Sequence, residues 1–259
     1  MSRPTVCVTF DNLGEVTDLE RGLWPEDEPL GRHFSVTRAL PRVLALLAEL
    51  GLRATFFVEG LNTELYPEAL RDIGAAGHEV AYHGWRHERW DGVDPSRERE
   101  LLERGVRALE GLGLRPAGFR PPGGRLTPSS LRTLADLGFS YCSPAGGPAG
   151  VHDGVAVLPF QWPLIDAFHY LPHFGDLREA ERGTPDVLAP DELRRTLVAA
   201  LRDVVERGGV LSLLFHPFLA DAGDRFDAMD AVLRELRALV DRRSVWCAPC
   251  RDVAARMLA

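Results

Sequence analysis

The chain has 259 residues, 45% of them hydrophobic, which is enough apolar material for a sizeable core. Its net charge of -8 argues against a nucleic-acid or anionic-membrane partner, since such partners require an excess of cations on the contact face. All 30 basic residues are arginine, which excludes a lysine Schiff base, a lysine general base and a phosphate-loop lysine.

No stretch approaches about 18 consecutive apolar residues, so we expect no membrane span. The first residues run directly into a strand pattern without the features of a secretory signal, which predicts a cytoplasmic protein unless a signal has been removed. The four cysteines are too few and too scattered for a disulfide framework. Cys247 and Cys250 have redox or metal-knuckle spacing, but without a second pair we favour buried thiols that have no chemical role.

Apolar runs rich in β-branched and aromatic residues alternate along the chain with helical patterns, as in βα units around a parallel sheet or barrel. The predicted strands are 6–10, 54–59, 78–83, 117–120, 139–143, 155–160, 210–216 and 244–247. The predicted helices are 36–50, 63–76, 95–111, 127–137, 190–207, 227–241 and 251–258. Glycines that follow four of these helices suit left-handed C-terminal caps: Gly51, Gly77, Gly113 and Gly138.

These seven or eight strand–helix units show neither a linker-like change in composition nor an internal repeat. The sequence therefore predicts an α/β fold in which residues 1–259 form a single domain, a TIM-like barrel. The long segments 13–35 and 145–154 are expected to shape a binding site or to be disordered. Catalytic groups in such barrels lie at the carboxyl ends of the strands, where this chain has Asp11, Glu59, His83, Arg120 and His216.

Two of the polar clusters have the composition of a metal site. His83 and His87, four residues apart, can point the same way from one helical turn. A carboxylate or amide on another strand could complete a zinc-type triad that leaves a position open for water. Asn12 follows Asp11 at the point where a charged ligand would be expected. Each residue alone has an ordinary explanation as a cap or turn residue, but coincidence at four strand ends is the weaker account.

These motifs resemble those of the polysaccharide deacetylases of the NodB-homology type, carbohydrate esterase family four. The family motif Thr-Phe-Asp-Asp is matched by residues 9–12 except at Asn12, and His-(Ser/Thr)-x-x-His is similar to residues 83–87. Arg-x-Pro-Tyr-Gly is similar to residues 120–124, with Gly123 in place of tyrosine, and Leu-x-x-His is matched by residues 213–216. The resemblance covers nearly the whole chain and implies a distorted (β/α)7-8 barrel.

Other features are similar to the intracellular-type branch of this family. They are the long insert after Asn12, the Phe-His-Pro step at 215–217 and the Val-Trp ending at 245–246. The segment 162–166 is similar to the branch's Trp-x-Leu-Asp-Asp, with only the second Asp kept. The branch includes peptidoglycan deacetylase-like proteins, and also cofactor-free allantoinases and cyclic-imide hydrolases.

The resemblance implies a role for each site residue. His83, His87 and Asn12 would bind a divalent metal, zinc by ligand type, that polarises an amide carbonyl and activates water. Asp11 would take the proton from the attacking water, and Arg120 would keep Asp11 ionised and oriented.

Three further groups would complete the site. His216 would protonate the leaving nitrogen, the alternative being a strand-end histidine satisfied by backbone. The backbone amide of Gly123 would bind the oxyanion. Asp166 would orient Arg120 or His216 or meet substrate, the alternative being a solvated loop carboxylate. Residues that could touch substrate, or belong to the core, are Trp85, Trp90, Trp162, His33, His169 and His173.

Asn12 leaves three interpretations open. Its amide oxygen could still coordinate the metal, though without most of a carboxylate's electrostatic attraction. Glu15, Asp18 or Glu59 could supply the missing charge. Alternatively no metal is bound, as in the cofactor-free branch, but retention of both histidines favours a metal.

The leading hypothesis is a metal-dependent hydrolase of non-peptide C–N bonds. It would remove an N-acyl group, typically acetyl, from an amino sugar or related metabolite, with a small molecule or an oligosaccharide as substrate. A cyclic amide hydrolase acting on an imide or an allantoin-like ureide is the first alternative, and a catalytically inactive carbohydrate-binding homologue is the second.

Overall fold

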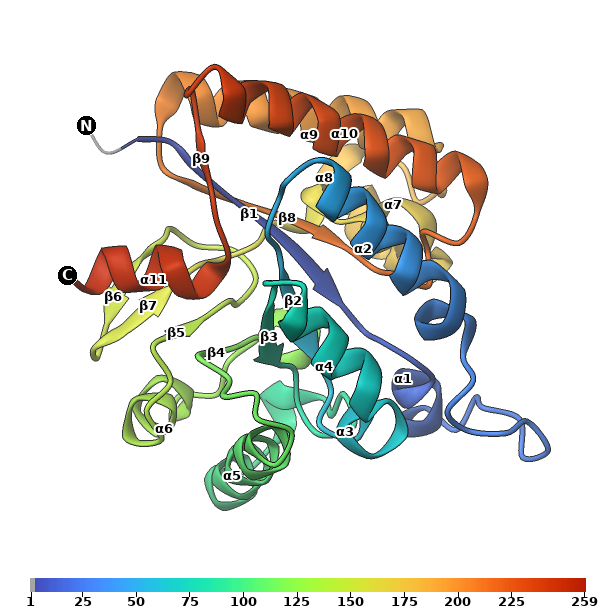
Figure 1. Cartoon of the computed structure of the whole chain (residues 1–259), viewed down its shortest axis with the longest axis vertical. Helices are drawn as coiled ribbons and strands as arrows, with labels where there is room; N and C mark the ends of the chain where they lie inside the picture. Colours follow the sequence, from blue (N-terminus) through green and yellow to red (C-terminus); the bar gives the residue numbers. More distant parts are fainter. Residues whose placement is uncertain (1–2) are drawn as a thin grey trace.

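The structure is a computed structural model that describes residues 3–259, and a nine-stranded sheet forms its centre (Figure 1). Its strands are β1 (Thr5–Asp11), β2 (Thr55–Val58), β3 (Glu79–Tyr82), β4 (Gly118–Phe119), β5 (Tyr141–Cys142), β6 (Gly150–His152), β7 (Val155–Val157), β8 (Val210–Phe215) and β9 (Trp246–Cys247). All eight predicted strands are confirmed. Strand β6, which lies inside the segment expected to be a loop, was not predicted.

The strand order is β6-β7-β5-β4-β3-β2-β1-β8, and every neighbouring pair is parallel except β6 and β7. The start of β1 pairs with β9 and its last three residues pair with β2, so two strands share one edge of β1. Beyond β7 the chain reaches the far side of the sheet, where Ile165 makes a parallel bridge to Leu214 of β8. This bridge joins the two sides of the curled sheet, and the expected distorted barrel is confirmed.

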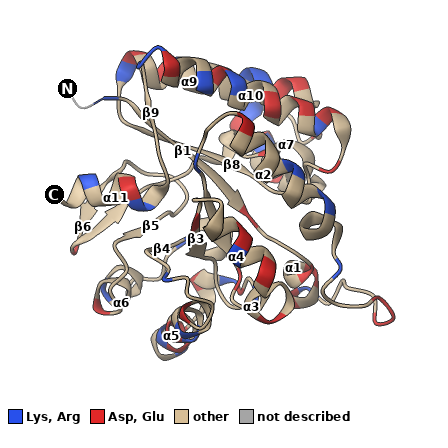
Figure 2. Cartoon of the chain, in the orientation of Figure 1, with Lys and Arg blue, Asp and Glu red and all other residues tan. Residues whose placement is uncertain are grey.

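Helices surround the sheet, and most of the charged residues lie on the helices while the strands carry few (Figure 2). The helices are α1 (Val16–Glu20), α2 (Leu40–Glu49), α3 (Asn62–Leu65), α4 (Pro67–Ala75), α5 (Pro95–Glu110), α6 (Ser130–Asp136), α7 (Asp166–Tyr170), α8 (Gly175–Arg182), α9 (Pro190–Arg207), α10 (Gly223–Asp241) and α11 (Cys250–Leu258). Shorter turns are η1 (Ser35–Ala39, π-helical), η2 (Trp90–Gly92), η3 (Pro122–Gly124), η4 (Trp162–Leu164) and η5 (Pro172–Phe174). Within residues 3–259 no helix combines the length and apolar content needed to cross a membrane.

All seven predicted helices are confirmed, with two differences in detail. The first begins with the π-helical turn η1, and the second is divided at Tyr66, because Pro67 starts a new helix. The four glycines expected at C-terminal caps all have left-handed φ angles, between +58° and +83°. The short helices α1, α7 and α8 were not predicted, because their segments are too short to show a helical repeat of apolar residues.

The apolar run of β1 explains its central place, since every residue of the strand is buried. Phe10 stacks on Phe56 of β2 with ring centroids 4.8 Å apart and tilts against Phe215 of β8 at 5.9 Å. Aromatic packing therefore fixes β1 between its two neighbours, and this places Asp11, its last residue, at the barrel end where those strands also end.

Segment 13–35 is held down rather than disordered. The Glu15 carboxylate accepts hydrogen bonds from the Gly31 amide, at 2.6 Å, and from the Tyr66 hydroxyl. The Ser35 hydroxyl accepts from the Gly14 amide at 2.9 Å. These contacts close the segment over the carboxyl ends of the strands, as its expected role in shaping a site requires.

Close packing between β4 and β5 yields a test of the fold. A Cβ added at Gly118 would overlap the buried ring of Tyr141. We expect Gly118→Ala to lower the free energy of unfolding by about 1–3 kcal/mol because the ring cannot move without strain. Gly223→Ala is the control, because a Cβ there meets nothing within 4 Å. Urea unfolding of both variants measures the difference, and equal stability would contradict the predicted overlap.

Candidate active site

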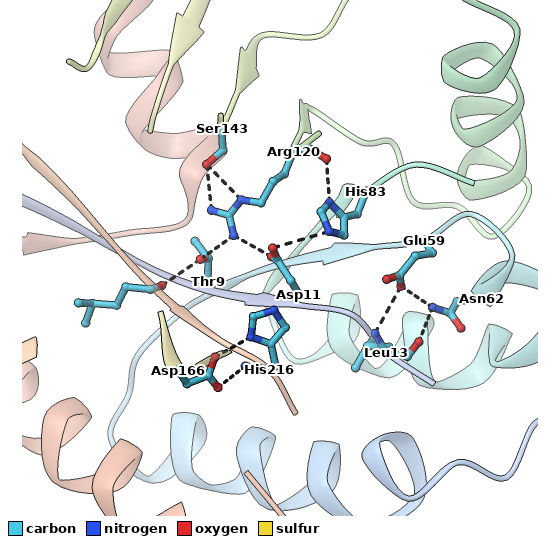
Figure 3. Close-up of polar contacts among 11 residues, drawn as sticks. Thr9, Asp11, Leu13, Glu59, Asn62, His83, Arg120, Ser143, Asp166 and His216 are labelled. Atoms are coloured by element: carbon cyan, nitrogen blue, oxygen red, sulfur yellow. Dashed lines mark hydrogen bonds and ion pairs between the residues drawn. The ribbon is translucent and has the colours of Figure 1, made fainter. Parts of the chain in front are cut away.

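A cavity of about 510 Å³ lies where the carboxyl ends of β1, β3, β4 and β8 meet. Its lining includes most of the residues that the sequence singled out, from segments far apart in the chain: Asp11, Asn12, His83, His87, Arg120, Gly123, Trp162 and His216. Figure 3 shows the polar contacts around it. The fold brings together a carboxylate–guanidinium pair, a carboxylate–imidazole pair and two further imidazoles.

The first pair is Asp11 and Arg120, both buried. Arg120 Nη1 donates to Asp11 Oδ1 at 2.7 Å and to the Thr9 hydroxyl at 3.0 Å (Figure 3). Its Nε and Nη2 donate to the Ser143 hydroxyl at 3.2 and 2.9 Å. Burial raises the pKa of Asp11, while the charge of Arg120 opposes that rise. The contacts of Thr9 and Ser143 with Arg120 were not predicted, although Thr9 belongs to the first motif.

The imidazole of His83 is fixed by the same arginine residue. Its Nδ1 lies 2.8 Å from the Arg120 carbonyl oxygen, which can only accept, so Nδ1 carries the proton and Nε2 is left with a lone pair. That Nε2 lies 3.8 Å from Asp11 Oδ2, and the ring centroid lies 5.0 Å from that of His87. Burial lowers the pKa of His83 to about 3 and the pKa of His87 well below its usual value. Both rings are therefore neutral near pH 7, the form that binds metals.

The loop that carries these two histidines is not the helical turn that the sequence suggested. Gly84 and His87 have left-handed φ angles of +76° and +68°. The Glu88 carboxylate accepts from the amides of Trp85 and Arg86 at 2.9 and 3.1 Å, which folds the loop back on itself. The two rings meet because of this local fold and not because of helical spacing.

Asn12 has the features of a candidate metal ligand. It lines the cavity with both histidines, and its Oδ1 is buried without a hydrogen-bond partner among the described residues. A buried polar atom without a partner is costly, and a cation would satisfy it. Residues 3–259 contain no group of three or more His, Cys, Asp or Glu placed to hold a metal, so a metal at this place would need a further kind of donor, and the Asn12 amide oxygen is the candidate. The three side chains fit a divalent metal.

Two of the three substitutes considered for the missing charge are unsuitable. Glu15 is engaged with Gly31 and Tyr66, and Glu59 accepts from the Leu13 amide and from Asn62 Nδ2 at 3.4 and 2.9 Å. Burial raises the pKa of Glu59 to about 8, so it is protonated and neutral near pH 7. Asp18 does line the cavity.

The second pair is His216 and Asp166. His216 Nδ1 lies 2.6 Å from Asp166 Oδ1, and the His216 amide donates to Asp166 Oδ2 at 2.7 Å (Figure 3). Burial lowers the pKa of His216, but the charge and hydrogen bond of Asp166 outweigh that effect and the net pKa is raised. Asp166 is buried, so the solvated-carboxylate alternative is wrong. Its carboxylate contacts His216 and the Ala167 amide, and not Arg120.

The remaining sequence candidates divide between cavity and core. Trp162, His33 and His173 line the cavity, as does Gly123 with a φ of +74°.

Trp85 does not line the cavity. Its side chain is buried against Gly60 and under the Arg104 guanidinium, whose carbon lies 3.5 Å from the ring centroid. This corrects the expectation that Trp85 contacts substrate. Trp90 is also in the core, and His169 Nε2 bonds the Pro163 carbonyl at 3.0 Å. Lining residues that were not predicted include Thr17, Arg21, Phe34, Phe160, Phe174 and Phe218.

The fold and site define an α/β-barrel protein with a buried cluster of carboxylate, guanidinium and imidazole groups at the carboxyl ends of its strands. The chain belongs to the polysaccharide deacetylase family, whose pattern matches residues 1–142. The family resemblance drawn from the sequence motifs is thereby confirmed.

Individual proteins show how far the similarity extends. Peptidoglycan deacetylase-like protein FGM2 of Gibberella zeae is 32% identical over 41% of this chain and 32% of its own length. A Mycobacterium smegmatis structure described as a polysaccharide deacetylase is 30% identical, with a TM-score of 0.82 over 99% of this chain and 91% of that one. Puue allantoinase shares the fold at 20% identity, with a TM-score of 0.75 over 97% and 89% of the two chains. The matched part spans 32–46% of the lengths of the first three curated relatives.

Proposed function

We propose that residues 1–259 form one catalytic domain, a divalent-metal-dependent hydrolase of non-peptide C–N bonds. Its reaction is the removal of an N-acyl group, acetyl in the leading case, from an amino sugar or related metabolite. One observation carries this proposal: Asp11 held by Arg120 and His216 held by Asp166 line the same cavity as two neutral histidines. Family membership supports it.

His83 through Nε2, His87 through its ring and Asn12 through Oδ1 would hold the metal, and zinc is the ion that suits two imidazoles. When bound, such an ion polarises an acyl carbonyl and lowers the pKa of water. Because Nδ1 of His83 carries the proton, the lone pair of Nε2 remains available to coordinate the metal.

The protein's own groups would move the protons. Asp11, kept in place by Arg120, accepts the proton of the attacking water. The backbone amide of Gly123 donates to the oxyanion of the tetrahedral intermediate. His216, protonated and oriented by Asp166, then gives its proton to the departing nitrogen. Acid and base are separate residues, each with its own partner, so both protonation states can exist at one pH.

Metal content and product release test the proposal together. Zinc-reconstituted protein is expected to release acetate from N-acetylated oligosaccharides, and His83→Ala is expected to lose both metal and activity. If the protein contains no metal and its His83→Ala variant keeps full activity, the proposal is contradicted. Cyclic imides and allantoin belong in the same screen, because ring opening consumes an amide without releasing acetate.

Asp166 should set the alkaline limit of activity. The acid must carry its proton, so activity is lost as pH rises through the pKa of His216, which Asp166 raises. We expect Asp166→Asn to move the alkaline limb of the kcat profile about one unit or more to lower pH. Asp18→Asn is the matched control: it removes another cavity carboxylate and should leave that limb in place. An unmoved limb in Asp166→Asn would contradict the assignment of His216 as the acid.

A further inference from the structure

Segment 59–62 follows β2 and lies between the two stretches of chain that carry the candidate metal ligands. Strand β2 pairs with β1 on one side and with β3 on the other. The end of β2 therefore adjoins both the turn after β1, which contains Asn12, and the loop after β3, which contains the two histidines. Glu59 and Asn62, the polar side chains of the segment, are fully buried and do not line the cavity. They can act on the site only through other residues.

On one side, the segment holds both backbone polar groups of Leu13, the residue after Asn12. The Glu59 carboxyl group accepts from the Leu13 amide at 3.4 Å, and Asn62 Nδ2 donates to the Leu13 carbonyl at 3.0 Å (Figure 3). The Leu13 amide shares a peptide plane with the Asn12 carbonyl, so these bonds orient the backbone of Asn12. The φ of Asn12, +58°, is sparsely populated by residues other than glycine and persists where the surroundings hold it.

On the other side, the segment is bonded through its main chain to the loop of residues 83–87. The Gly60 amide donates to the Gly84 carbonyl at 2.8 Å, and the Leu61 amide donates to the Trp85 carbonyl at 3.0 Å. A Cβ on Gly60 would lie 2.4 Å from Cε3 of Trp85, so only glycine allows the two stretches to approach this closely. The loop is therefore fastened to the segment between its two histidines.

This fastening matters most for the weakest of the three candidate ligands. Asn12 offers a neutral amide oxygen, and its attraction for a dication is much smaller than that of a carboxylate. Such a ligand contributes more to affinity when it loses little conformational freedom on binding. Oδ1 of Asn12 is already buried without a partner among the described residues, on the cavity that both histidines line. Its position is set in advance.

We propose, on the basis of the proposed function, that Glu59 and Asn62 are positioning residues for the metal. Through the Leu13 backbone they hold Asn12 at a fixed distance from the two histidines. Glu59 Oε2 accepts from the Leu13 amide and, at 2.9 Å, from Asn62 Nδ2, so a single oxygen joins the three residues. The position of this oxygen matters, and not a charge on the carboxyl group. Glu59 thus holds the neutral ligand in place and does not replace the charge that it lacks.

Zinc affinity, measured by competition with a chelator, tests the role of Asn62. Asn62→Ala removes the two hydrogen bonds that the side-chain amide donates, and it is expected to weaken zinc binding about 10–100-fold. Tyr141→Phe is the matched control, because it also removes a hydrogen bond to a buried glutamate, Glu79, but at the amino ends of the strands. Its zinc affinity should stay within twofold of the wild type. Equal zinc affinity in Asn62→Ala and the wild type would overturn the inference.

Two replacements of Glu59 separate position from charge. Glu59→Gln keeps an oxygen that can accept both hydrogen bonds and should bind zinc less than threefold more weakly than the wild type, whereas Glu59→Leu should lose as much affinity as Asn62→Ala. The visible spectrum of the cobalt-loaded protein should change in Asn62→Ala but not in Glu59→Gln or Tyr141→Phe, since it depends on the positions of the ligands. Glu59→Gln decides alone if the other variants do not fold, because a tenfold loss of zinc affinity would contradict the positioning role.

Acetate release separates this inference from the proposed function. If the zinc-loaded wild type releases acetate while Asn62→Ala binds zinc equally well, the proposed function stands and the positioning role is wrong. If the wild type binds zinc without releasing acetate and Asn62→Ala binds it weakly, the positioning role stands and the proposed function is wrong. If the wild type binds no zinc, both are wrong.

Discussion

Asn12→Asp is expected to tighten zinc binding about 100-fold, because a full negative charge replaces a neutral oxygen in direct contact with a dication. The backbone should accept the change, since Asn12 has a φ of +58° and aspartate tolerates that left-handed conformation as asparagine does. Competition titration against a chelator of known affinity measures the change, and zinc should raise the Tm of the variant more than that of the wild type.

Two further variants decide whether the gain arises at this site. Asn12→Ala removes the buried oxygen and should bind zinc more weakly than the wild type. The double variant Asn12→Asp, His87→Ala should lose the gain, because the carboxylate then lacks one of its partner ligands. If Asn12→Asp binds zinc no better than the wild type, Asn12 is not a ligand and the proposed donor set is wrong.

Asp11→Asn is expected to lower kcat by about 10²–10⁴-fold, the usual contribution of a positioned general base. The amide keeps nearly the same shape and can still accept from Arg120, so the loss would reflect proton acceptance and not a collapsed site. KM should change little, since the base acts on water and not on bound substrate. Steady-state kinetics of the zinc-loaded variant provides the measurement.

Thr9→Val is the matched control for that experiment. It removes one acceptor of Arg120 Nη1 but leaves the 2.7 Å bond to Asp11 and the two bonds to Ser143. Its kcat should fall less than tenfold. Comparable losses in Thr9→Val and Asp11→Asn would mean that the orientation of Arg120, and not proton transfer to Asp11, limits the reaction.

The sequence pattern predicted the fold because its strongest signals are local. The apolar run from Val6 to Phe10 and the glycine caps such as Gly51 act within one element, and both are found as expected. Long-range contacts could not be predicted in the same way. Ser143 contacts Arg120 only because β5 lies beside β4. The order of strands in a sheet cannot be inferred from the residues of either strand alone.

Most of the predicted site residues line the cavity, but the sequence did not predict their local geometry. Spacing alone suggested that His83 and His87 share a helical turn, whereas the Glu88 carboxylate folds this stretch into a loop. Trp85 and Trp162 are both aromatic and close to motifs, yet one lies against Gly60 in the core and the other faces the cavity. Residue type and spacing do not determine which way a side chain points when the backbone leaves regular structure.

The bridge between Ile165 and Leu214 has a consequence for dynamics. It is a single bridge across the seam of the barrel, and Asp166 and His216 lie one and two residues beyond its two ends. Opening of the seam would therefore separate the carboxylate from the imidazole that it orients. The His216 amide proton, which is donated to Asp166, should exchange with solvent deuterium only through that opening, so its protection from exchange would report the fraction of time the acid is misaligned.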